Sequence, residues 1–169
     1  LSPSELADKK LKIERKIRAC QAGKKMMQDT ARVFTDNLGP NINSRWDDYT
    51  PLVTADDSLL FFTSRRSSTS GGKINPYNNQ YFEDIYYSVK VRGKWREAQN
   101  MGGTVNSDKN EAAVSVTPDG QTIYIFDGGS NNGDIFYSHK EGNQWGRPRN
   151  ISRKINSRYH ESSVAISYD

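Results

Sequence analysis

Carboxylate side chains return at one position of an internal repeat, and they are the side chains best placed to do chemistry in this chain. Asp48, Glu111 and Glu161 each stand just before a short apolar run. A carboxylate presented once per repeat has two uses. A ring of such groups lining a channel can hold cations or a basic peptide, or each group can accept hydrogen bonds from backbone, Ser or Arg groups of the neighbouring repeat. We expect the structural use.

Two further pairs of residues recur, and we expect both to be structural. Asp84 and Asp134 begin an expected strand, where a carboxylate can bind exposed loop N–H groups. Trp95 and Trp145 are expected to fill the space between adjacent repeats. The alternative for the tryptophans is a stacking surface for sugar.

Catalytic and metal-binding patterns have little support in the sequence. His139 and His160 are the two histidines, and neither adjoins a nucleophile motif. Residues 127–134 are rich in oxygen ligands and glycine, so calcium is conceivable there, but the acids do not alternate as in a calcium-binding loop. We therefore predict a protein that is not an enzyme, with no cofactor and no metal site.

The segment 67–81 is the candidate for contact with a partner. It combines Ser, Thr and Gly with aromatic and amide side chains that are typical of recognition loops. A disordered insertion without a partner is the alternative. The candidate contact residues, including two flanking arginines, are Arg65, Arg66, Tyr77, Asn78, Asn79 and Tyr81.

An internal repeat must position these side chains. Residues 84–88 return fifty positions later as residues 134–138, and Trp95 returns as Trp145 at the same offset. Several independent matches at one offset indicate a structural unit of about 50 residues.

A third copy precedes the other two. Residues 42–44 match residues 105–107 at an offset of sixty-three, which places thirteen extra residues in the 67–81 loop. Each repeat contains four short strand patterns, and the Asp119 and Gly120 pair indicates a two-residue hairpin turn.

Four strands per repeat are typical of the blades of a β-propeller. We predict a mainly β fold: a partial β-propeller of two complete four-stranded blades plus the start of a third, preceded by an N-terminal α-helix. The expected repeats are at about 42–104, 105–154 and 155–169. Because such a set cannot close a ring, we expect the chain to be a fragment of a longer protein.

The N-terminal residues read as a helical segment, 1–32, ahead of the propeller fragment, 33–169. Leu6, Ile13, Ile17 and Cys20 recur at spacings of seven, four and three, which are built from threes and fours and predict an apolar stripe with Cys20 buried. We expect Gly23 to interrupt this helix, with a short second turn before residue 30. An unpaired helix must pack on something, and we expect it to be the last helix of an upstream helical domain; the alternative is a helix that packs on the propeller.

The charge distribution argues against nucleic acid as a partner. Residues 1–30 hold eight basic and four acidic residues, which account for the whole net charge of +4. The rest of the chain is balanced, so the repeats have no electrostatic reason to bind phosphates. No apolar run approaches the length of about 20 residues that a membrane-spanning helix needs.

The repeats resemble the WD40-like (PD40) propeller repeats of the family that includes the TolB propeller, and more closely the variant in large envelope proteins of Bacteroidetes. The segments that carry the likeness are residues 42–44 (Ile-Asn-Ser), 47–49 (Asp-Asp-Tyr), 62–66 (Phe-Thr-Ser-Arg-Arg), 83–86 (Glu-Asp-Ile-Tyr) and 93–95 (Gly-Lys-Trp). In that family the propeller follows a tetratricopeptide domain and precedes an OmpA-like peptidoglycan-binding domain, which implies that the helical segment, 1–32, is the end of an upstream tetratricopeptide-like domain.

The resemblance implies a function outside catalysis. It implies a protein–protein interaction scaffold in the periplasm, associated with the outer membrane, in a type IX secretion or gliding machinery. The expected partners are other envelope and secretion proteins, together with peptidoglycan bound through a domain not in this chain. The alternatives are an accessory propeller domain of a hydrolase or peptidase and a glycan-binding propeller.

Overall fold

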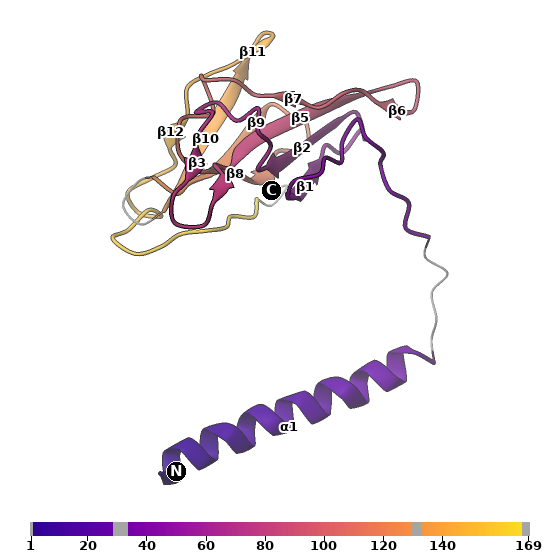
Figure 1. The fold of residues 1–169 in the computed structure, drawn as a ribbon, viewed down its shortest axis with the longest axis vertical. Helices are drawn as coiled ribbons and strands as arrows, with labels where there is room; N and C mark the ends of the chain where they lie inside the picture. The colour runs from indigo at the N-terminus through magenta and orange to yellow at the C-terminus, as the bar shows by residue number, and fades with distance from the viewer. Residues whose placement is uncertain (1, 29–33, 130–132, 167–169) are drawn as a thin grey trace. The chain divides into compact units, whose positions relative to one another are not determined.

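A computed structural model describes residues 2–28, 34–129 and 133–166, and it shows one N-terminal helix followed by antiparallel β-sheets (Figure 1). The chain divides into two compact units, residues 1–36 and residues 37–169. The fold is therefore mainly β with one helix at its N-terminal end. Within the described residues, no helix has the length and apolar character needed to span a bilayer.

Helix α1 (Pro3–Met26) has a well-formed N-terminus. Ser2 Oγ accepts a hydrogen bond from the Glu5 N–H (3.3 Å), and the Glu5 carboxylate accepts one from the Ser2 N–H (2.7 Å). This reciprocal capping satisfies two of the backbone donors that a helix start leaves unpaired. Pro3 suits the first turn because its ring fixes a helical φ angle.

The predicted interruption at Gly23 is wrong, because α1 continues through this residue to Met26. Glycine costs about 1 kcal/mol relative to alanine inside a helix, which is too little to end one of this length. Lys24 and Lys25 in the last turn also interact favourably with the helix dipole. The turn predicted up to residue 30 extends into positions outside the described residues.

The predicted burial of Cys20 is also wrong, since the thiol is exposed. None of the α1 residues is buried, and Leu6, Ile13 and Ile17 are 61%, 58% and 51% exposed. The apolar spacing therefore predicted the helix correctly, but the burial that it predicted for the apolar residues is not found.

Two five-stranded antiparallel sheets make up most of the β unit. The first contains β1 (Asp48–Val53), β2 (Leu59–Ser64), β5 (Asp84–Val91), β6 (Lys94–Trp95) and β7 (Gln99–Asn100). The second contains β8 (Glu111–Val116), β9 (Thr122–Asp127), β10 (Asp134–Glu141), β11 (Gln144–Trp145) and β12 (Arg149–Asn150). In each sheet three long strands follow one another, and two short strands share the outer edge of the third.

The two sheets correspond pair by pair. Phe62 lies opposite Tyr86 between β2 and β5, and the equivalent pair between β9 and β10 is Ile125 opposite Phe136. The sheets differ in the connection before the third strand, where the first sheet carries a small hairpin of β3 (Ile74–Asn75) and β4 (Gln80–Tyr81). This hairpin lies in the segment to which the sequence assigned the extra residues.

The turn between β8 and β9 differs from the predicted two-residue turn. The Thr117 N–H donates to the Thr122 carbonyl (2.9 Å), so four residues lie between them, and Gly120 has a φ of +66°. Thr117 Oγ1 and the Gln121 N–H both donate to Asp119 Oδ1 (2.6 and 3.0 Å). The threonine and aspartate side chains thus stabilise a longer loop.

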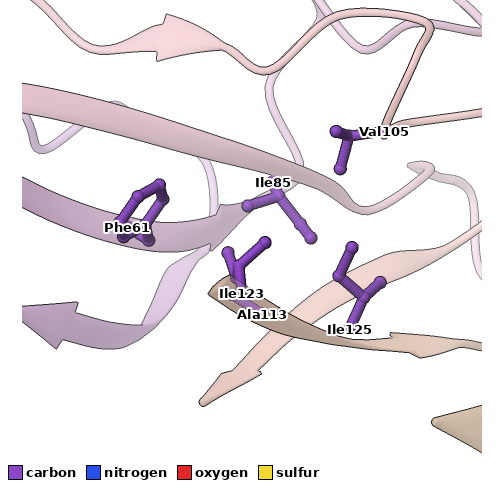
Figure 2. Close-up of a cluster of buried hydrophobic side chains, with 6 residues drawn as sticks. All are labelled: Phe61, Ile85, Val105, Ala113, Ile123 and Ile125. Atoms are coloured by element: carbon purple, nitrogen blue, oxygen red, sulfur yellow. The ribbon is translucent and has the colours of Figure 1, made fainter. Parts of the chain in front are cut away.

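The hydrophobic core lies where the two sheets face each other (Figure 2). Phe61 and Ile85 from the first sheet meet Ala113, Ile123 and Ile125 from the second, and all of these side chains are fully buried. Ile123 and Ile125 lie two residues apart on β9 and so share one face, as the alternation of side chains along a strand requires. The burial of these large apolar groups joins the sheets.

The third repeat contributes a leading segment but no described strand. The predicted strand at residues 164–166 is not formed, although these residues are described. A strand needs a hydrogen-bonded neighbour, and no described segment pairs with this one.

Candidate protein-interaction site

The β3–β4 hairpin presents an exposed aromatic side chain on an ordered turn. The Asn79 N–H donates to the Asn75 carbonyl (2.9 Å), and Asn79 has a φ of +56°, a conformation that asparagine tolerates. Asn75 Oδ1 accepts from the Tyr77 N–H (3.0 Å), and Asn78 Oδ1 accepts from the Gln80 N–H (3.1 Å). Tyr77 at this tip is 96% exposed.

The base of the hairpin is attached to the first sheet through Asp84, which is fully buried at the start of β5. Thr69 Oγ1 donates to Asp84 Oδ1 (2.8 Å), and the Ser70 N–H and Asn100 Nδ2 donate to Oδ2 (2.6 Å each). This agrees with the expected role of the repeated aspartate in binding loop donors. Asp134, its equivalent, is also buried, but it adjoins residues 130–132, which lie outside the described residues.

The part of the inserted segment just before the hairpin touches the leading segment of the second repeat. Lys73 Nζ lies 3.3 Å from Asp108 Oδ2, and Gly71 packs so closely that an added Cβ would lie 2.8 Å from the Asp108 Cα. Any side chain at residue 71 would therefore displace backbone. These contacts hold the inserted segment between the two repeats.

Arg65 binds the end of the hairpin at Tyr81. Its guanidinium pairs with the Glu83 carboxylate and donates to the Tyr81 carbonyl (3.2 Å), and Tyr49 Oη donates to the same carboxylate. Burial, followed by the hydrogen bond to Glu83, raises the pKa of Tyr49 above its ordinary value. The Tyr81 ring contacts Trp46 edge to face, with centroids 6.4 Å apart.

Arg66 is likewise used inside the chain. It pairs with Asp48 (3.2 Å), donates to the Ile42 carbonyl, and lies 5.1 Å from the ring centres of Phe62 and Tyr86. The side chains of Arg65 and Arg66 are only 16% and 12% exposed. Of the six candidate contact residues, these two arginines therefore hold the fold together, and the hairpin residues Tyr77, Asn78 and Asn79 form the accessible tip.

The three repeated acids all accept hydrogen bonds from a serine four residues earlier. The Ser44 N–H and Oγ donate to Asp48 (2.6 and 2.8 Å), and Ser107 makes the same pair of bonds to Glu111. The third pair is Ser157 and Glu161 (3.2 and 2.6 Å). The serine partners belong to the same repeat as the acid, whereas the sequence led us to expect partners in the neighbouring repeat.

The first two of these acids differ in electrostatic environment. Burial raises the pKa of Asp48, but the nearby Ser64 hydroxyl, the hydrogen bonds from Ser44 and the charge of Arg66 together outweigh it, so the pKa lies below its ordinary value. Burial raises the pKa of Glu111 above its ordinary value, and the nearby Asp127 and Asp84 charges add to this effect. Glu111 has no arginine partner corresponding to Arg66 among the described ion pairs.

A repeated asparagine, which the sequence reasoning used only as a marker of the repeat, links each repeat to the one before. Asn106 Oδ1 accepts from the Ile85 N–H (2.9 Å), and its Nδ2 donates to the Ile85 carbonyl (3.0 Å). Asn156 makes the same two bonds to Ile135 (2.9 and 2.7 Å). The side-chain amide thus takes the place of a neighbouring strand. Its recurrence within the repeated segment of Ile or Val, Asn and Ser was the available signal.

The two repeated tryptophans are partly buried in hydrophobic clusters. Trp145 contacts Phe61 of the first sheet edge to face, with centroids 5.6 Å apart. Trp95 packs against the cluster of Ile42, Leu60, Phe62 and Tyr86. Trp145 thus contributes to the contact between the sheets.

The histidines make different contacts. His139 Nδ1 lies 3.0 Å from Thr122 Oγ1 on the neighbouring strand, at an exposed position. The His160 ring meets Phe126 edge to face at 5.3 Å. Among the described residues, no group of three or more His, Cys, Asp or Glu side chains is arranged to hold a metal ion.

Comparison with known proteins adds no identification. The chain matches no protein-family model and no curated protein sequence.

Proposed function

We propose that the β unit is a two-blade portion of a β-propeller that serves as a non-enzymatic scaffold for protein–protein interaction. The scaffold belongs to the periplasmic side of the outer membrane, in a type IX secretion or gliding machinery linked to peptidoglycan. The likeness of the repeats to envelope propellers supports the location and the machinery. The inserted hairpin supports the binding role.

One observation carries this proposal: a fully exposed tyrosine on a turn that is ordered before any partner binds. The tip contacts within residues 75–80 fix the backbone, and the Asp84 and Asp108 contacts fix the base. A loop that is already ordered loses little conformational entropy on binding, so a larger share of its contact energy appears as affinity. Tyrosine supplies a large amphipathic surface with few rotatable bonds.

Photo-crosslinking tests the proposal directly. The protein is produced in its own cells with benzoylphenylalanine at position 77, the cells are irradiated, and crosslinked proteins are identified by mass spectrometry. We expect crosslinks to outer-membrane or secretion proteins. Tyr159, which is 64% exposed on the leading segment of the third repeat, gives the matched control position.

The control decides the outcome. Envelope proteins captured at position 77 and absent at position 159 support the scaffold. The same set at both positions, or no capture at position 77, contradicts a specific contact at the hairpin tip.

A further inference from the structure

We propose that the outer part of the second sheet binds a small carboxylate that also carries a hydrogen-bond donor. A cavity of about 300 Å³ opens on one face of β10, the face on which the alternate residues Tyr137, His139 and Glu141 lie. It is lined by Tyr137, His139, Glu141, Gly146, Arg147 and Arg149. This proposal is independent of the hairpin.

The internal repeat shows how the cavity arises. Gly146 corresponds to Arg96 of the first sheet: the Gly146 N–H donates to the His139 carbonyl (2.9 Å), as the Arg96 N–H does to Val89 (3.0 Å). Ser138 and Ser88 donate to the carbonyls of Gly146 and Arg96 (2.7 and 2.6 Å). The backbone is therefore the same, and the second sheet lacks the side chain at this point.

The charge of the lining differs between the sheets. Glu97 and Gln99 of the first sheet are replaced by Arg147 and Arg149 in the second, and Val89 is replaced by His139. Arg149 lies directly opposite Tyr137 on the neighbouring strand, so the two side chains share one face. In the first sheet the equivalent residues bond to each other, because Tyr87 Oη donates to Gln99 Oε1 (2.8 Å).

The two arginines are available to a ligand. Arg147 and Arg149 take part in none of the ion pairs formed by the described residues, unlike Arg65 and Arg66. Guanidinium groups bind carboxylates with two parallel hydrogen bonds, and a tyrosine hydroxyl can donate a third. These groups define an anion site.

Glu141 indicates which group the ligand should carry beside its carboxylate. A Cβ placed on Gly146 would lie 3.4 Å from Glu141 Oε1, so this carboxylate borders the space that the glycine leaves open. A purely anionic ligand would be repelled by Glu141, whereas an ammonium or hydroxyl donor beside the ligand carboxylate would be attracted. The lining thus favours a molecule of the amino-acid type over a simple dicarboxylate.

The experiment compares two ligands of one carbon framework. L-Glutamate, which has an ammonium group, and glutarate, which lacks it, are titrated into the ¹⁵N-labelled protein, with chemical shifts of residues 137–149 as the readout. We expect glutamate to bind at least tenfold more tightly than glutarate. Inorganic phosphate is the control anion, because it has neither a carboxylate nor an ammonium group.

Three variants test the assignment. Arg147→Glu with Arg149→Gln installs the residues that the first sheet carries at these positions, so the variant is compatible with the fold. It should weaken glutamate binding at least tenfold. Glu141→Gln should remove the preference for glutamate over glutarate. Glu97→Gln, on the first sheet, should leave binding unchanged.

Definite results would overturn the proposal. These are the absence of shifts in residues 137–149 at tens of millimolar glutamate, and glutamate binding that the double variant leaves intact. Equal affinity for glutamate, glutarate and phosphate would reduce the site to unspecific anion attraction and contradict the assigned ligand class.

Discussion

Equivalent carboxylates in the two sheets have pKa values shifted in opposite directions. Asp48 has an arginine partner and a lowered pKa, whereas Glu111 is buried beside other acids and has a raised pKa. For Asp48 the folded protein gains stability above the ordinary carboxyl pKa of about 4, and this gain is lost as the pH falls through the folded value. For Glu111 the folded state holds more protons than the unfolded state, so stability falls as the pH rises from the ordinary to the raised value.

Amide substitutions at these two positions should therefore have opposite effects. At pH 7, Asp48→Asn should destabilise the β unit by about 1–3 kcal/mol, because Arg66 loses its partner in a poorly hydrated site. Glu111→Gln should raise stability by about 1 kcal/mol, because the amide oxygen accepts from the Ser107 N–H, the amide NH₂ donates to Ser107 Oγ, and no buried charge remains. Urea unfolding at pH 7 and pH 4 measures both, and the difference between the variants should shrink at pH 4.

The repeated asparagine allows a comparison within one protein. Asn106→Ala should cost about 1–3 kcal/mol, because it leaves the buried Ile85 N–H without a partner, whereas the Ile85 carbonyl keeps its bond from the Met101 N–H (3.1 Å). Asn43, at the equivalent position of the first repeat, bonds to the Asn37 side chain, and Asn43→Ala should cost less than about 1 kcal/mol. Equal losses in urea unfolding would contradict the bridging role of Asn106.

At the scale of single elements, the inserted hairpin and helix α1 show which local rules hold. In the hairpin, Thr69→Val removes the donor to Asp84 Oδ1 while keeping the shape of the side chain. We expect a loss of about 1–3 kcal/mol, because a fully buried carboxylate oxygen is left unpaired. Tyr77→Ala should leave the thermal midpoint unchanged, since the side chain is almost wholly exposed. Differential scanning calorimetry of both variants checks this contrast.

Helix α1 tests the cost of a glycine that does not end a helix. A methyl group added to Gly23 would have no neighbouring atom within 4 Å, so Gly23→Ala introduces no clash. We expect about 1 kcal/mol of added helix stability, seen as more ellipticity at 222 nm and a higher melting temperature of that signal. A loss of ellipticity would indicate a packing role for this glycine.

The sequence predicted elements whose signals are local and repeated, and it failed where tertiary context decides. The fifty-residue offset between residues 84–88 and 134–138 predicted β5 and β10, and the longer offset between residues 42–44 and 105–107 predicted the place of the insertion. It did not predict that Arg65 and Arg66 fold back onto Glu83 and Asp48, because those partners are distant in sequence. The exposure of Cys20 was not predicted, because helical spacing shows which residues share one face of a helix but not whether another element packs on that face.

For the whole molecule, the two sheets share one core, so they should unfold together. Ile123→Ala removes a fully buried side chain at their interface and should cost about 2–5 kcal/mol. In this variant, indole fluorescence from Trp95 alone and from Trp145 alone, each recorded with the other two tryptophans replaced by Phe, should give coincident transitions. Val53→Ala, at a position 47% exposed, should cost less than about 1 kcal/mol. Separate transitions would show that each sheet is an independent folding unit.

The exposed thiol of Cys20 allows each of the two compact units to be observed with its own spectroscopic probe. All three tryptophans, Trp46, Trp95 and Trp145, belong to the unit of residues 37–169, and the one cysteine belongs to α1. A maleimide dye therefore labels the helical unit alone, while indole emission reports on the β unit alone. Energy transfer from the indoles to a dye on Cys20, together with the dye's rotational correlation time, measures whether the helix tumbles with the sheets or independently of them.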